Sequence, residues 1–359
     1  MKFVQIPHIE SAWDNVIIKT LSPSTFSWVN RGCGYQVLLQ KALSTFNNSS
    51  LSLPSNRNAI LGKIIHTLYE LTQKGELRNV SDLKTKWEEL VFIEKNKLAD
   101  NYPTLRNANL NNYVKRNCAI RYALGLMKKN KSNPLANGVK VYSEKRLDCS
   151  ELGLKGVADK LVVYNGNIDV IDFKSGHVKE ENGEIKEEYQ VQLHLYAVMC
   201  HHLSLGKPRS LYLVDIDGEY FQVPYSHNFA NKLIDDVKST IEMLNSTILN
   251  KSFYSLVKSD LGMCSYCDSR HICQYRNISL DSYYQTVTGK VVEVPSTNLY
   301  VLQSFENILY VSGLDVYQVE SPQEYIGRTL VFVNITRASQ IADDFTYKIT
   351  ENTLVYEQI

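Results

Sequence analysis

The chain has 359 residues, 44% hydrophobic and 21% charged, which is enough to bury a large core and predicts one large domain plus a small one. No stretch has the apolar length that a membrane span needs, and the N-terminal segment lacks the basic-then-apolar order of a signal peptide, so we expect a cytoplasmic protein without a membrane partner. Seven cysteines in no regular framework argue against a secreted disulfide scaffold and favour reduced thiols, some of them metal ligands.

The net charge of +1 conceals an uneven distribution along the chain. Residues 281–359 hold 4 Lys and Arg against 10 Asp and Glu, a net charge of −6, whereas residues 1–280 hold 35 against 28, a net charge of +7. The pattern changes at the same place, from long helical periods to short β-rich runs separated by turn residues. We therefore predict a domain boundary near residue 280. A small barrel of the oligonucleotide-binding kind suits the C-terminal domain, although its negative charge speaks against direct contact with nucleic acid.

Within the first domain, helices and strands follow one another in blocks. Apolar residues three and four apart predict helices at 34–45, 58–73, 80–97 and 107–130, followed by a strand at 139–147. The sequence KGVADKLVVYNGNIDVIDFKSG, residues 155–176, reads as two strands joined by an Asn-Gly-Asn hairpin turn. Helical periodicity returns at 187–204 and 227–249. This order predicts an α/β core whose sheet is at least partly antiparallel.

The second strand of the hairpin ends in an unusual way, with Asp172 and Lys174 two residues apart and directly before Ser175 and Gly176. Alternation along a strand places Asp172 and Lys174 on one face. An isolated pair of this kind is most often a surface ion pair, but the hairpin can also bring Asp159 beside Asp172. Two carboxylates at one spot repel each other unless a cation joins them, and oxygen ligands suit Mg²⁺ or Mn²⁺. A nearby ammonium can stabilise charge that builds up on a phosphate.

Two helical segments add polar residues to the same candidate centre. In LGKIIHTLYEL, His66 lies on the flank of an apolar helix face, and in YQVQLHLYAV, Gln192 and Tyr196 stand at i and i+4 on one face. Each of these features alone is more readily explained as part of the core.

Taken in order, the segments LGKIIH, GVAD, DFK and QLHLY resemble the motifs of the RecB-like branch of the PD-(D/E)XK nucleases, across roughly residues 20–276. The resemblance implies a restriction-endonuclease-like α/β core and a catalytic metal ion, Mg²⁺ or Mn²⁺. The residues that it assigns to that metal are His66, Asp159, Asp172 and the backbone carbonyl of Phe173.

The same resemblance assigns the remaining polar residues of these motifs. Lys174 would be the catalytic lysine, and Gln192 and Tyr196 would orient the site or the bound strand. Glu144, in VYSEKRL, matches an acid that often stands on the strand before the hairpin, and its role stays open.

The run MCSYCDSRHIC carries Cys264, Cys267 and Cys273, which can wrap one metal centre but leave it a ligand short. We expect Cys33, far upstream, to complete the set, with His271 as an alternative ligand. Four thiolates suit either Zn²⁺ or a [4Fe-4S] cluster, and the spacing leaves the metal open. One cysteine before the core and three after it is similar to the iron–sulfur members of the family, the AddB-type and CRISPR-associated spacer-processing nucleases. That resemblance favours [4Fe-4S] as a structural staple across the domain.

These expectations combine into metal-dependent hydrolysis of DNA, on single strands or DNA ends, in repair, recombination or defence. The sequence has no G-x4-GK[ST] phosphate loop, so strand separation would need a helicase or another subunit in trans. A catalytically silent DNA-binding or scaffold subunit of a nuclease–helicase complex is the alternative of another class, and an RNA substrate is a third reading. The full set of motif residues argues against the silent subunit.

Overall fold

The computed structural model describes residues 2–102, 105, 109–132, 138–258, 260–276, 284–341 and 344–359. Its larger part is built on a mixed sheet with the strand order β2-β3-β4-β5-β6. All neighbouring strands are antiparallel except β4 and β5, which are parallel and are joined by the crossover helix α6. The strands are β2 (Lys140–Cys149), β3 (Leu154–Tyr164), β4 (Asn167–Phe173), β5 (Lys207–Val214) and β6 (Tyr220–Val223).

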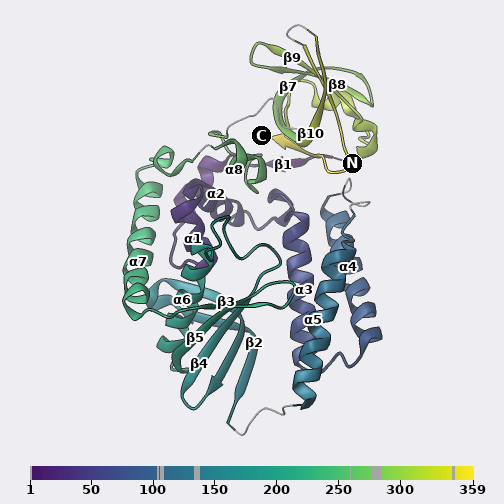
Figure 1. The fold of residues 1–359 in the computed structure, drawn as a ribbon. Helices are drawn as coiled ribbons and strands as arrows, with labels where there is room; N and C mark the ends of the chain where they lie inside the picture. Colours follow the sequence, from purple (N-terminus) through teal and green to yellow (C-terminus); the bar gives the residue numbers. More distant parts are fainter. Residues whose placement is uncertain are drawn as a thin grey trace.

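Helices cover both faces of this sheet, which gives three layers (Figure 1). On one face the core is shared with α1 (Pro23–Arg31), α2 (Gly34–Ser44), α6 (Glu187–His202) and α7 (His227–Leu249). On the other face it is shared with α3 (Arg57–Gln73), α4 (Val80–Asn101) and α5 (Tyr113–Ser132).

The central strand β4 carries apolar residues on both of its faces. Ile168 and Val170 belong to the core on the α6 side, whereas Ile171 and Phe173 belong to the core on the α3 side. A strand with helices on both faces needs apolar residues on both of them. The side chains of β4 therefore alternate between the two cores, as expected from the sequence. The strand ends at the edge of the sheet, between the two helical layers.

Local signals set the ends of several helices. Asn56 caps α3, because its Oδ1 accepts a hydrogen bond from the Ala59 N–H at 2.9 Å. Ser22 caps α1 in the same way and Pro23 follows at the first helical position, a start signal that the sequence contains but that our expectations did not use. The helix expected at 107–130 begins at Tyr113, and part of the expected start, residues 107–108, lies outside the described residues.

The C-terminal strands form a closed barrel rather than an open sheet. The ring runs β7-β8-β9-β11-β10 and closes because β10 also pairs with β7, with β9 and β11 parallel to each other. Five strands closed in this way match the strand number of the oligonucleotide-binding fold. The strands of the ring are β7 (Tyr284–Ser296), β8 (Leu299–Ser304), β9 (Asn307–Ser312), β10 (Thr329–Ile341) and β11 (Asp344–Lys348), and β12 (Leu354–Gln358) pairs with β10 outside the ring.

The N-terminus also takes part in this second sheet. Strand β1 (Val4–Ile6) pairs in parallel with β12, which itself extends the barrel from β10, and both termini lie beside the barrel in Figure 1. The expected division assigned this segment to the first domain, whereas the structure pairs it with the C-terminal strands. The expected boundary at residue 280 falls within 277–283, outside the described residues.

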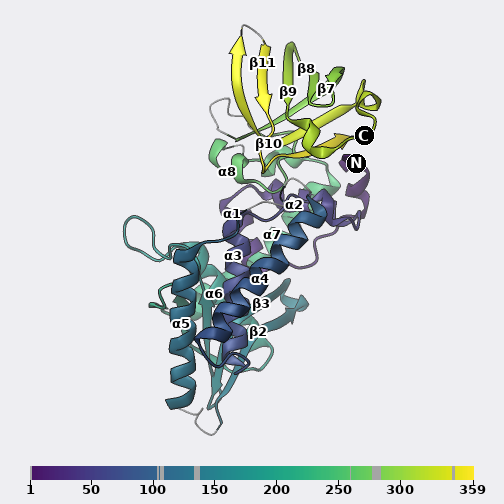
Figure 2. The ribbon, with the colours of Figure 1, turned by 90° about the vertical axis from the view of Figure 1, so that its right-hand side faces the viewer.

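A small apolar cluster joins the two parts. Tyr102 and Leu105, near the end of α4, and Leu53 pack against Val331 and Tyr356 of the barrel. Figure 2 shows the barrel on the end of the larger part where α2, α4 and the short helix α8 (Leu261–Tyr266) lie. Among the described residues, no helix is long and apolar enough to cross a membrane.

Candidate active site and cysteine pocket

Three carboxylates form a row across neighbouring strands of the central sheet. Glu144 of β2 stands opposite Asp159 of β3, because the residues on either side of both are paired in one register. The β3–β4 ladder ends one step short of Asp159 and Asp172. In place of a further backbone bond, the Phe173 N–H donates to Asp159 Oδ2 at 2.7 Å. The strands thus separate where the carboxylates stand.

His66 of α3 completes a group that could hold a metal ion. Its Nδ1 lies 3.4 Å from Asp159 Oδ1 and 3.6 Å from Glu144 Oε1. One ligand atom from each of these three side chains lies within 4.8 Å of the other two. Burial alone would lower the pKa of His66, but Asp159 and Glu144 outweigh it and raise the pKa to about 10. Two carboxylates and an imidazole are hard and borderline ligands that suit Mg²⁺ or Mn²⁺.

The backbone at Glu144 is strained. Its φ of +47° lies in the left-handed region although the residue is in a strand and is not glycine. Such a conformation costs about 1–3 kcal/mol and persists where the surrounding structure enforces it. The strain accompanies the placement of the Glu144 carboxylate beside His66 and Asp159.

Asp172 is placed differently from its expected partners, since its carboxylate is bound to Lys174. Lys174 Nζ lies 2.7 Å from Asp172 Oδ2 and donates to Gln192 Oε1 at 2.7 Å. Burial raises the pKa of Asp172 to about 6 against the opposing effect of Lys174. Burial would lower the pKa of Lys174, but Asp172 outweighs it and the net shift is upward. Asp172 and Lys174 therefore form a buried contact between a carboxylate and an ammonium group, next to the candidate metal ligands His66, Glu144 and Asp159.

Helix α6 presents a third group to Lys174 that our sequence analysis missed. The ring of Tyr189 lies 4.4 Å from Lys174 Nζ, measured to the ring centroid, in cation–π geometry. Tyr189 precedes Gln192 by three residues, so both side chains lie on one helical face. That i, i+3 spacing was the available signal.

Tyr196, one turn beyond Gln192, is buried against the sheet. A Cβ at Gly156 would lie only 3.0 Å from Tyr196 Cε1, so glycine allows β3 to approach this ring. Burial, and secondarily the charge of Asp172, raises the pKa of the Tyr196 hydroxyl. Tyr196 therefore stays neutral and packs behind the site.

The site opens into a groove of about 1620 Å³, which we call the active-site groove. His66, Glu144 and Lys174 line its inner part. Lys63 and Arg146 add positive charge to the lining, as a path for a polyanion requires.

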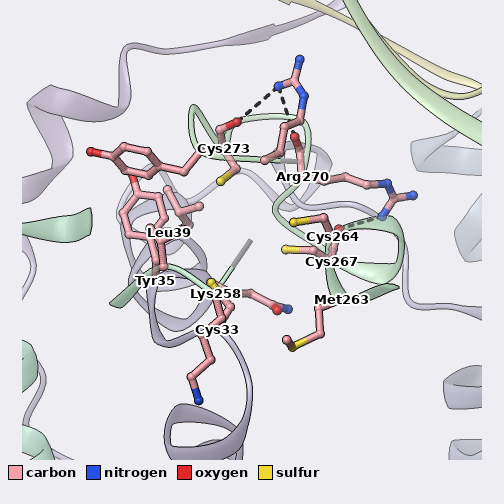
Figure 3. A pocket seen from close by; sticks show the side chains of 13 residues that line it. Cys33, Tyr35, Leu39, Lys258, Met263, Cys264, Cys267, Arg270 and Cys273 are labelled. Carbon is pink, nitrogen blue, oxygen red and sulfur yellow. Dashed lines mark hydrogen bonds between the residues drawn. The ribbon is translucent and has the colours of Figure 1, made fainter. Parts of the chain in front are cut away.

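Four cysteines meet in a second pocket, which we call the cysteine pocket. Cys33 comes from the start of α2, and the others come from the loop of residues 264–276, here named the cysteine loop. Figure 3 shows the four sulfur atoms around one shared space. Burial raises the pKa of Cys267 to about 12 and that of Cys273 to about 11. His271, the alternative ligand, does not line the pocket, and its Nε2 lies 2.7 Å from the carbonyl oxygen of Leu51.

The fold and the row of acids followed by Lys174 define a nuclease core of the α/β class. The family model described as the PD-(D/E)XK nuclease superfamily matches residues 20–274, and the chain therefore belongs to that superfamily. Among solved structures, one named "Putative exonuclease" from Eubacterium rectale is similar at 12% identity with a TM-score of 0.34. The match covers 75% of this chain and 94% of the other. No curated protein matches the chain.

Proposed function

We propose that the protein is a metal-dependent deoxyribonuclease that hydrolyses phosphodiester bonds in single strands or at DNA ends. The observation that carries the proposal is the His66, Glu144 and Asp159 group beside the buried Asp172–Lys174 pair. A divalent ion held there supplies Lewis-acid polarisation of the phosphate and a bound water of lowered pKa.

Residues of the chain would bind the metal ion and stabilise charge on the phosphate. His66, Glu144 and Asp159 would hold the ion, with Asp172 and the Phe173 carbonyl as the further ligands implied by the family resemblance. Lys174, kept cationic by Asp172, would stabilise the charge that develops on the phosphate. Gln192 and Tyr189 would hold the Lys174 ammonium in place.

We further propose that the cysteine pocket holds a [4Fe-4S] cluster rather than Zn²⁺. The choice of iron and sulfur over zinc rests on the family resemblance, in which one cysteine stands before the core and three after it. Arg270 and Arg276 also line the cysteine pocket and would offset the negative charge of the thiolates. Anaerobically purified protein should be brown and contain about four irons per chain, whereas colourless protein with stoichiometric zinc would refute the cluster.

The test of the nuclease proposal is digestion of end-labelled single- and double-stranded DNA, and of RNA, with Mg²⁺ or Mn²⁺. Wild-type protein should cleave DNA at least as well with Mn²⁺ as with Mg²⁺, because an imidazole ligand favours Mn²⁺ over Mg²⁺. Lys174→Ala and Asp172→Ala should abolish cleavage with the fold intact. Lys155→Ala is the matched control, since Lys155 forms an exposed ion pair with Asp148 at 3.0 Å on the same sheet. Undiminished cleavage by folded Asp172→Ala protein would refute the assignment of Asp172 to the active site. Wild-type protein that cleaves no nucleic acid would favour a scaffold subunit.

A further inference from the structure

A second cavity lies between the nuclease core and the barrel, near the start of α3. We call it the interdomain cavity. The start of α3 and the end of α4 form one side, and Asn334, Glu351 and Asn352 of the barrel form the other. Asn56, the capping residue of α3, lines both this cavity and the active-site groove. The two spaces therefore lie on either side of one residue at the start of α3.

The chemistry of the interdomain cavity differs from that of the groove. Its charged lining residues balance, with Arg57 and Arg270 against Asp268 and Glu351, so it offers no net attraction to a phosphate. Ile60, Leu98 and Leu105 belong to its apolar walls, and asparagine amides stand among them. Apolar walls with a few amide donors and acceptors suit a flat heteroaromatic ring, since asparagine amides pair with base edges.

Internal hydrogen bonds hold the side-chain amides of Asn56 and Asn334 in place on the two sides of the cavity. Asn56 Oδ1 accepts the Ala59 N–H, which leaves its amide NH₂ group as the part that can donate to a ligand. Across the cavity, Asn334 Oδ1 accepts from Arg270 Nη2 at 2.8 Å, and Asn334 Nδ2 donates to the Asn352 carbonyl at 3.1 Å. The barrel side of the cavity is thus held against the cysteine loop, a preorganised arrangement for binding.

We infer that the interdomain cavity binds an unpaired nucleobase of the DNA strand whose phosphate lies in the active-site groove. The inference rests on the proposed function and names its substrate more closely. Asn56 and His66 are ten residues apart on one helix, which is about 15 Å. That distance corresponds to about four nucleotides at the stacked spacing of 3.4 Å per strand, and fewer if the strand is stretched. A base can enter only when its pairing edge is free, so the substrate is single-stranded on that side of the cleaved bond.

The experiment is a scan of single-stranded oligonucleotides that each lack one base, with cleavage at a fixed bond measured on the wild-type full chain. We expect a loss of about tenfold, the size of one base contact, when the missing base lies two to five nucleotides from that bond on one side. The scan is repeated with Asn352→Trp, which places a large ring at a position that lines the cavity, and with Val316→Trp, which places the same side chain on an exposed position of the C-terminal part outside it. The position-dependent loss should disappear in Asn352→Trp and persist in Val316→Trp.

A flat scan on wild-type protein, or an unchanged peak in folded Asn352→Trp, would overturn the inference. The wild-type scan decides the matter by itself if Asn352→Trp does not fold. A wild type that cleaves no DNA would refute the proposed function and this inference with it, whereas cleavage with a flat scan refutes only the inference.

Discussion

Glu144 combines a carboxylate that faces a candidate metal site with a backbone conformation that its residue type disfavours. No feature of VYSEKRL predicts a positive φ at Glu144, because glutamate in a strand normally adopts an extended backbone. The role that the sequence left open for Glu144 therefore becomes a specific proposal only with the structure, through its contact with His66.

Glu144→Asn separates the two properties of this position. Asparagine tolerates the left-handed region better than glutamate, but its shorter side chain ends in a neutral carboxamide and supplies no carboxylate. We expect metal-dependent cleavage to fall at least tenfold, while the melting temperature of metal-free protein does not decrease by more than a degree or two. Calorimetric titration with Mn²⁺ and thermal unfolding measure the two effects. Retained metal affinity would show that Glu144 is not a ligand.

Tyr189 offers a second test at the scale of one residue. Tyr189→Phe keeps the ring over Lys174, whereas Tyr189→Leu removes it. A cation–π contact worth about 0.5–2 kcal/mol predicts a two- to thirtyfold fall in kcat for the leucine variant, with KM little changed. The phenylalanine variant should remain near wild type. Equal losses in both variants would point to the hydroxyl instead of the ring.

At the scale of elements, the long periodic segments were predictable and the short ones were not. The helices around residues 58–73 and 227–249 match their expected ranges closely, since apolar periodicity and core contacts coincide there. Strands β5 and β6 were missed although LYLV is apolar and flanked by turn residues. Strand β1 has three residues, and its pairing partner is about 350 residues away, so no local pattern could reveal it.

His194 links two elements on the α6 side and makes their packing sensitive to pH. Its Nδ1 lies 2.7 Å from the Gln190 carbonyl, and its Nε2 accepts the Ser226 N–H at 3.2 Å, at the start of α7. Burial lowers the pKa of His194, so the folded chain holds it neutral. The unfolded chain, with a histidine pKa of about 6.5, binds the proton more readily.

The lower pKa of His194 in the folded chain makes unfolding easier as the pH falls below about 6.5. Above that pH the full stabilisation by neutral His194 is retained. His194→Gln, which has no ring to titrate, should cost stability at pH 7.5 and less at pH 5. Urea unfolding of both proteins at the two values measures the difference. A cost that is the same at both pH values would contradict a neutral buried His194.

For the whole molecule, the candidate active-site and cofactor residues were named from ordered motifs, and the structure brings them to two centres. Sequence spacing could not show that the cysteine loop also contacts the barrel, because those contacts depend on how the two parts pack. Polar and aromatic side chains of the loop make several of these contacts. The pairs are Arg270 with Asn334, Arg276 with Thr288, and the ring of His271 with that of Tyr356.

The cysteine pocket therefore sits where a crosslink would hold three parts together: the segment before α2, the end of the nuclease core and the barrel. Closing a chain segment of more than 200 residues is worth roughly 5 kcal/mol in the loop-entropy model. Cys33→Ala should lower the melting temperature and remove the colour of the cluster. Because the cysteine loop contacts β7, β10 and β12, hydrogen exchange should rise there before it rises in β8 and β9, which lack those contacts. Exchange that stays unchanged throughout the barrel in cluster-free protein would show that the barrel docks independently of the four cysteines.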